Sequence, residues 1–146
     1  MNTSLKNLRP QRPSLFRLAA DGHSLDFLFC VCDACSRLTF PANAPGCTHC
    51  GAPLDSKRQV TRPGGGKLLE FVTLHVPLVP DMPSPMVAGD IEIAEGVFEE
   101  GVIAVTDEQQ LHIGMQMRAI AVPLDLTDTF ACRFVPAMSA SEEAQV

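Results

Sequence analysis

Clustered cysteines are the residues of this sequence whose type and spacing most clearly indicate chemistry. The chain has six cysteines, and five of them lie between Cys30 and Cys50. Two Cys-x-x-Cys pairs, Cys32 with Cys35 and Cys47 with Cys50, are separated by eleven residues. Each pair can present two thiolates to one tetrahedral ion, so the spacing predicts a zinc ribbon. Four thiolates fill the coordination sphere and leave no position for a reacting water, so we expect the zinc to be structural.

The fifth clustered cysteine, Cys30, has two possible roles. One residue separates it from Cys32, so in a strand both side chains point to the same side. Cys30 is either a small buried apolar residue, which we favour, or a ligand. Cys132 lies in a later strand pattern, and we interpret it as buried and apolar too. We expect His49, between Cys47 and Cys50, to lie at the surface and point away from the ion.

Catalytic machinery is not visible in the sequence. No histidine stands beside Cys30 or Cys132, and a nucleophilic cysteine needs a nearby base. The carboxylates after residue 90 alternate with apolar residues, as on the solvated face of a sheet. We therefore expect no catalytic residues in this chain, and a self-standing esterase-like enzyme is the least favoured hypothesis.

The segment RPGGGK at 62–67 has two interpretations. It lacks the GxxxxGK[ST] spacing of a phosphate-binding loop and is followed by no helical pattern. We favour a flexible hinge between ribbon and barrel, and the alternative is contact with a phosphate-bearing ligand.

Charge and composition bear on the class of partner. The formal net charge is −6, and the basic residues are scattered mostly through the first 67 positions. Nucleic-acid binding normally needs a basic stripe, and single-strand platforms need more aromatic surface than eight Phe with no Trp or Tyr. We expect no nucleic acid and no membrane as partner, because no apolar run approaches the roughly 20 residues of a spanning helix. Clustered reduced thiols and no secretory signal favour the cytoplasm.

Strand patterns dominate the chain after the cysteines. Five apolar or alternating runs separated by turn residues lie at 67–76, 86–95, 97–106, 116–122 and 129–135. They predict a five-stranded antiparallel barrel of the OB kind, with a sandwich as the alternative. The segment VPLVPDMPSP joins the first two runs, and its prolines predict a stiff extended loop.

The expected organisation is mainly β, with four parts. Residues 1–24 form an N-terminal arm and a short helix, capped by Ser14 and ended by Gly22. Residues 25–58 form the rubredoxin-like zinc ribbon, and 59–137 form the OB-fold domain. The acidic tail, 138–146, is expected to be disordered.

These features together resemble a known family. The resemblance covers about 120 residues and is carried by CDACSRLTFPANAPGCTHCG at 32–51, the glycines at 64–66, EIAEGVFEEGVIAV at 92–105, and LHIGMQMRA at 111–119 followed by FACRFVPA. The sequence is similar to the zinc-ribbon/OB-fold family of acyl-CoA-associated proteins. Its members are small subunits of thiolases, acyltransferases and hydratases, among them benzoylsuccinyl-CoA thiolase.

The resemblance implies a function as well as a fold. It implies a hetero-oligomer in which a thiolase-fold partner holds the catalytic residues, while this chain braces it and helps wall the acyl-CoA channel. The implied coenzyme A contacts are Arg62, Gly64, Gly65, Gly66 and Lys67. The family's glycine step usually reads Gly-x-Gly before a β-branched residue, so the Gly66-Lys67-Leu68 found here departs from it. The second hypothesis is a single-stranded nucleic-acid-binding module, as ribbon-plus-OB proteins often are.

Overall fold

Strand β3 (Leu25–Val31) is the centre of the first of two sheets in the computed structural model, which describes residues 4–55, 58–80, 82–124 and 127–137. It pairs antiparallel with three shorter strands: β2 (Phe16–Leu18), β4 (Leu38–Thr39) and β5 (Gln59–Pro63). These strands position both cysteine pairs, because the first pair comes directly after β3 and the second pair comes after β4.

The second sheet is the predicted OB barrel, which is confirmed. Its strands are β6 (Gly65–Leu74), β7 (Met86–Ala94), β8 (Val97–Ile103), β9 (Gln116–Pro123) and β10 (Thr129–Pro136). The order β10-β8-β7-β6-β9 is closed by antiparallel pairing of β9 with β10. The β8–β10 contact is parallel, and bulges after Leu68 and Glu92 bend the strands around the closure.

The predicted N-terminal helix is wrong. Residues 16–18 form β2, and Leu18 pairs with Leu25 across a tight turn. Before it lie a 3₁₀ turn, η1 (Leu5–Asn7), and β1 (Arg9–Pro10), which runs parallel to β10. A short helix gains little from its own hydrogen bonds, whereas pairing with β3 satisfies the backbone and buries Phe16 to 4% exposure.

The two faces of β3 bury different clusters. Leu25, Phe27 and Phe29 pack into the barrel core with residues such as Leu68 and Phe130. The alternate residues, Leu28 and Cys30, face a small cluster with Ala42 and Leu54 on the cysteine side. β3 is therefore buried on both faces, and its alternation joins the barrel to the cysteine segment through one strand.

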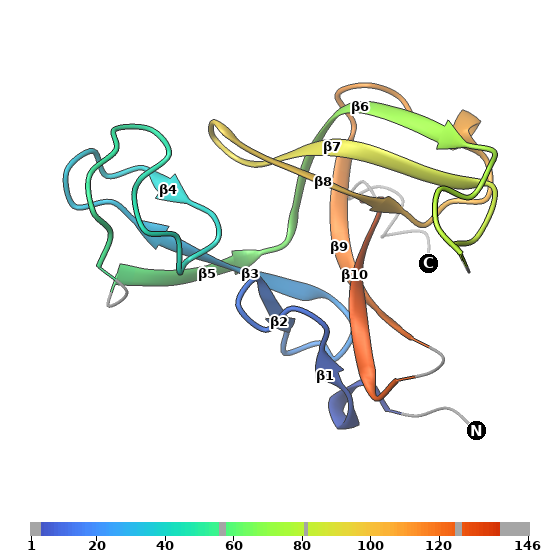
Figure 1. Cartoon of the computed structure of the whole chain (residues 1–146), viewed down its shortest axis with the longest axis horizontal. Coiled ribbons are helices and arrows are strands. Elements are labelled where there is room, and N and C mark those ends of the chain that lie inside the picture. The colour runs from blue at the N-terminus through green and yellow to red at the C-terminus, as the bar shows by residue number, and fades with distance from the viewer. Residues whose placement is uncertain (1–3, 56–57, 81, 125–126, 138–146) are drawn as a thin grey trace, which may run out of the picture.

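Figure 1 shows the resulting shape. The loops around β4 stand at one end of the molecule, β6, β7 and β8 lie at the other, and β3 and β5 run between them. A second 3₁₀ turn, η3 (Glu108–Gln110), lies between β8 and β9. The part of the chain that the structure describes contains no helix long and apolar enough to cross a membrane. The tail predicted to be disordered lies outside the described residues.

Candidate metal centre

The four predicted ligands come together in space. The sulfur atoms of Cys32, Cys35, Cys47 and Cys50 all lie within 4.8 Å of one another. Across the two pairs, Cys32 Sγ lies 3.6 Å from Cys50 Sγ, and Cys35 Sγ lies 3.7 Å from Cys47 Sγ. A tetrahedral ion with metal–sulfur bonds of about 2.3 Å requires sulfur–sulfur edges of about 3.8 Å. The quartet therefore fits one tetrahedral metal ion, and the cysteines are free thiols without disulfides.

Two knuckles with the same backbone scheme hold the four sulfurs. In the first, the N–H of Cys32 donates to Arg37 O (3.0 Å) and the N–H of Ser36 donates to Cys32 O (2.8 Å). In the second, Cys47 donates to Ala52 (2.8 Å) and Gly51 donates back to Cys47 (2.9 Å).

The residues after the second cysteine of each pair let the chain turn. Ser36 has φ +66° and Gly51 has φ +79°. This is the left-handed conformation that glycine adopts without strain, and a small residue such as serine tolerates it better than a bulky one.

Hydrogen bonds to the sulfur of Cys47 favour its thiolate form. The N–H of His49 donates to Cys47 Sγ at 3.3 Å. Burial raises the pKa of Cys47, but the N–H groups of Cys50 and His49 and the hydroxyl of Thr39 outweigh it and lower that pKa to about 5. A metal site needs its cysteines as thiolates, and these donors favour that form at Cys47. At Cys50 the N–H of Ala52 lowers the pKa, but the neighbouring thiols and burial raise it to about 11.

Thr39 is a functional residue that the sequence analysis missed. It is fully buried, its hydroxyl hydrogen-bonds to Cys47, and its oxygen accepts the N–H of Thr48 at 3.3 Å. Thr39 thus links β4 to the second knuckle. Only the pairing of Thr39 with Cys30 across the sheet puts it there, and a threonine in isolation carries no such signal.

The remaining cysteines lie outside the quartet. Cys30 is fully buried, and its sulfur lies 3.3 Å from the carbonyl oxygen of Asp55. Burial raises the pKa of the Cys30 thiol, and the negative charges of Asp55 and Asp33 raise this pKa further. Of its two possible roles, the structure supports the buried apolar one. Cys132 is inert for a similar reason, since burial raises its pKa to about 12.

The β7–β8 hairpin of the barrel packs against the cysteine segment. A Cβ atom built on Gly96, at the tip of this hairpin, would lie 3.1 Å from both Arg37 and the His49 ring. His49 is therefore half-buried rather than at the surface, and its Nε2 lies 2.9 Å from Leu38 O.

An ion pair also contacts the first knuckle. Arg58 lies 3.2 Å from the carboxylate of Asp33, which stands between Cys32 and Cys35.

The glycine triplet is tightly paired backbone, so its interpretation as a flexible hinge is wrong. The N–H of Gly64 donates to Leu25 O (2.7 Å), and its carbonyl accepts from Ala119 (3.0 Å). A Cβ on Gly65 would lie 2.3 Å from Met117 O, and one on Gly66 would lie 1.9 Å from Glu92 O. These three positions require glycine because the chain passes here from β5 of the first sheet to β6 of the second, in close contact with the neighbouring residues.

Comparison with known proteins shows what this chain is similar to. Residues 59–122 match the family model described as the ChsH2 C-terminal OB-fold domain. Among solved structures, the chain is similar to a chain of an Ltp2-ChsH2(DUF35) aldolase, with 26% identity and a TM-score of 0.60 over 77% of this chain and 85% of that one. The chain is therefore similar to ChsH2-like OB-fold proteins, and the family model covers β5 and the barrel strands β6 to β9. No curated protein matches it in sequence.

In this ChsH2-like chain, the residues predicted to contact coenzyme A lie in two places. Arg62 lies on β5, whose residues are all exposed, and it lines a cleft of about 200 Å³ with Arg37 and Glu95. Lys67 is exposed at the start of β6, beside Glu92 and Gln116, and it does not line that cleft. The structure therefore does not bring the two cations into one described cavity.

Proposed function

We propose that this chain is the non-catalytic, zinc-binding subunit of an enzyme complex that processes acyl-CoA. It braces a thiolase-fold catalytic partner in a cytoplasmic hetero-oligomer and helps form the coenzyme A channel. The observation that carries this proposal is the likeness, over most of both chains, to a chain of an aldolase whose name joins ChsH2 to a second component, Ltp2.

The chemistry of the side chains supports a non-catalytic role. A four-thiolate centre leaves no open position, so a zinc ion held by Cys32, Cys35, Cys47 and Cys50 would stiffen the fold and activate no substrate. A Ser-His-Asp group also exists, with Ser24 Oγ 3.4 Å from His23 Nδ1 and His23 Nε2 3.7 Å from Asp21. These residues form one exposed turn in which Asp21 accepts the N–H groups of His23 and Ser24, and they line none of the cavities described here.

The proline-rich loop after β6 supports docking of a partner. Val76, Leu78 and Val79 are 70%, 72% and 59% exposed, in a segment with four prolines. Apolar side chains on a stiff loop lose little entropy on binding, so this loop is a suitable contact for the catalytic subunit.

The coenzyme A contacts belong to the same proposal. Arg62 and Lys67 supply exposed positive charge on either side of the glycine triplet, Gly64, Gly65 and Gly66, whose tight packing fixes the backbone between them. We infer that these two cations face the phosphates of a coenzyme A bound between the subunits.

The electrostatics of the barrel disfavour the nucleic-acid alternative. OB-folds bind oligonucleotides mainly on the face of their second and third strands, here β7 and β8. Cross-strand pairing places Glu70, Asp90 and Glu100 in one row on this sheet. A row of carboxylates repels a phosphate backbone, so this face does not suit a nucleic acid.

Copurification tests the proposal. A tagged full-length chain, expressed at native level and purified without chelator, should retain one thiolase-fold protein in stoichiometric amount, and the complex should turn over an acyl-CoA. If a single-stranded oligonucleotide is retained instead, in a salt-dependent manner, and no enzyme subunit is found, the proposal fails.

A further inference from the structure

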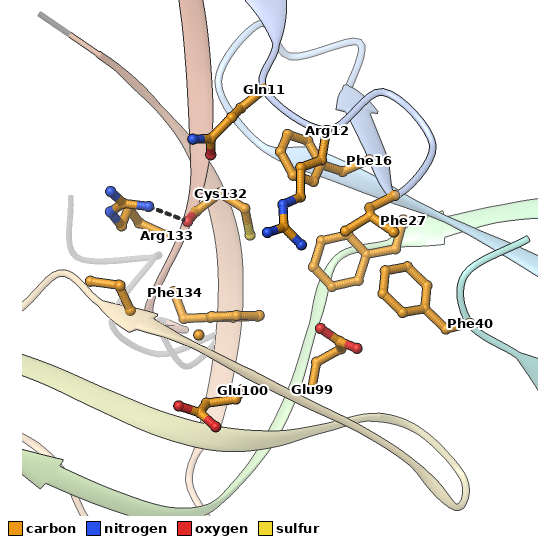
Figure 2. Close-up of a pocket in the computed structure, with 13 residues that line it drawn as sticks. Gln11, Arg12, Phe16, Phe27, Phe40, Glu99, Glu100, Cys132, Arg133 and Phe134 are labelled. Atoms are coloured by element: carbon orange, nitrogen blue, oxygen red, sulfur yellow. Dashed lines mark hydrogen bonds between the residues drawn. The ribbon is translucent and has the colours of Figure 1, made fainter. Parts of the chain in front are cut away.

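A cavity of about 250 Å³ lies where the N-terminal segment crosses the barrel. Figure 2 shows Phe16 and Phe27 on one side of it with Phe40 next to Phe27, and Phe134 of β10 forms its floor. Leu15 also lines the cavity. Gly101 leaves room for that floor, because a Cβ there would lie 2.4 Å from the Phe134 ring. The cavity is therefore a partly open chamber with aromatic walls and an aromatic floor, and charged side chains complete its lining.

Besides Gln11, Glu100 and Arg133, three side chains with polar groups line this chamber and carry the argument: Arg12, Glu99 and Cys132. In Figure 2, Arg12 extends from the N-terminal segment and Glu99 from β8, toward each other, with the sulfur of Cys132 beside the guanidinium. Within the described part of the chain, the side chains of Arg12 and Glu99 form no hydrogen bond and no ion pair within 4.0 Å, although their charges attract each other. The chamber thus has an exposed donor and a half-buried acceptor on facing sides, and both side chains can still accept a ligand as a hydrogen-bond partner.

We propose that this chamber binds a small neutral ligand in which an apolar or aromatic body carries an amide. An amide carbonyl can accept from the guanidinium of Arg12, and an amide N–H can donate to the carboxylate of Glu99. The ring or alkyl body of the ligand then packs against the phenylalanine walls.

Charge decides between this ligand class and its charged relatives. The cations Arg12 and Arg133 are matched by the anions Glu99 and Glu100 in the lining, so the chamber is close to neutral. A carboxylate ligand would pair with Arg12 and meet Glu99 as a like charge, and an ammonium ligand would meet Arg12. An uncharged amide hydrogen-bonds to both groups without placing a like charge beside either of them.

The volume limits the ligand to a small molecule. At about 30 Å³ for each water in the liquid, the chamber holds about eight waters. A ligand of roughly ten non-hydrogen atoms fills it, and benzamide is a suitable probe. A binding constant on the order of 1 mM is expected for a molecule of this size.

The test compares three probes of the same shape on the full-length chain: benzamide, benzoate and benzylamine. Methyl NMR signals of Leu15 report occupancy, because this residue lines the chamber. Benzamide should give saturable shifts, and the two charged probes should bind at least five-fold more weakly. No saturable shift with benzamide, or tighter binding of either charged probe, overturns the proposal.

Two variants test the polar contacts separately. Arg12→Met and Glu99→Met should each weaken benzamide binding at least five-fold, whereas the exposed Arg17→Met and Glu70→Met should leave it unchanged. Unchanged binding to both chamber variants would also overturn the proposal. If a variant does not fold, the order of the three probes on the wild-type chain still decides, and that result does not depend on any catalytic partner.

Discussion

Thr39 shows how one hydroxyl group connects the fold to the metal centre. Thr39→Val keeps the shape of the side chain but removes the donor to Cys47 and the acceptor of the Thr48 N–H. The part-buried Thr48 N–H and the Cys47 sulfur each lose a hydrogen-bond partner, so stability should fall by about 1–2 kcal/mol. Loss of the hydrogen bond to a ligand should weaken zinc affinity by about 10- to 100-fold. Competition with a chromogenic chelator measures the affinity, and Thr61→Val on exposed β5 should leave it unchanged.

Glu99 gives the fold a specific pH dependence. Burial raises the pKa of Glu99, while the charge of Arg12 lowers it less strongly. The folded protein therefore holds this proton more tightly than the unfolded chain does, and stability falls as the pH rises from the unfolded pKa through the folded one. Glu99→Gln should increase stability at pH 7.5, by less than about 1 kcal/mol because the group is half exposed, and by nothing at pH 4. Thermal unfolding checks this, and an equal gain at both pH values would refute it.

Ligand residues were predictable from the sequence, and their supporting residues were not. The two knuckles are local, since each pair of cysteines and the small residue after it lie within five positions, so spacing alone identified them. Thr39 acts through cross-strand pairing, and Glu99 meets Arg12 only because the N-terminal segment folds back over β8 and β10. Contacts between residues so distant in the sequence carry no periodic pattern.

The start of β6 is the element whose geometry is most restrictive. Gly66→Ala would place a Cβ 1.9 Å from Glu92 O, so β6 and β7 would have to separate. Gly114 also has a positive φ, +93°, but a Cβ there meets nothing within 4 Å. We expect Gly66→Ala to cost more than about 3 kcal/mol or to prevent folding, and Gly114→Ala to cost about 1 kcal/mol. Urea unfolding of the two variants measures the difference, and similar losses would show that the close approach is unimportant.

The strands of the barrel and the predicted helix illustrate the limits of pattern analysis. Alternation such as D-I-E-I-A-E identified β7 because one side of that strand is buried and the other wet. Leu15, Phe16, Leu18 and Ala19 suit one side of a helical turn, but the same residues suit a strand paired with β3. Tertiary pairing decides such short segments, and their own periodicity does not.

At the scale of the whole molecule, the proposed docking loop can be separated from stability. Val79 and Ile113 are both 59% exposed, in different loops. Val79→Asp should weaken binding of the catalytic partner by at least ten-fold, because an apolar contact becomes a desolvated charge. Ile113→Asp is the matched control and should bind normally. Surface plasmon resonance with immobilised partner gives both values, and equal binding by the two variants would remove the loop from the interface.

Reconstitution of the copurifying catalytic subunit is the most direct test of the proposed function. The partner is purified alone, and its acyl-CoA turnover is measured before and after addition of this chain, either zinc-loaded or stripped by a chelator. We predict little turnover by the partner alone, full turnover with one equivalent of the zinc-loaded chain, and little with the stripped chain. Full activity of the isolated partner, or equal rescue by the stripped chain, would contradict the account.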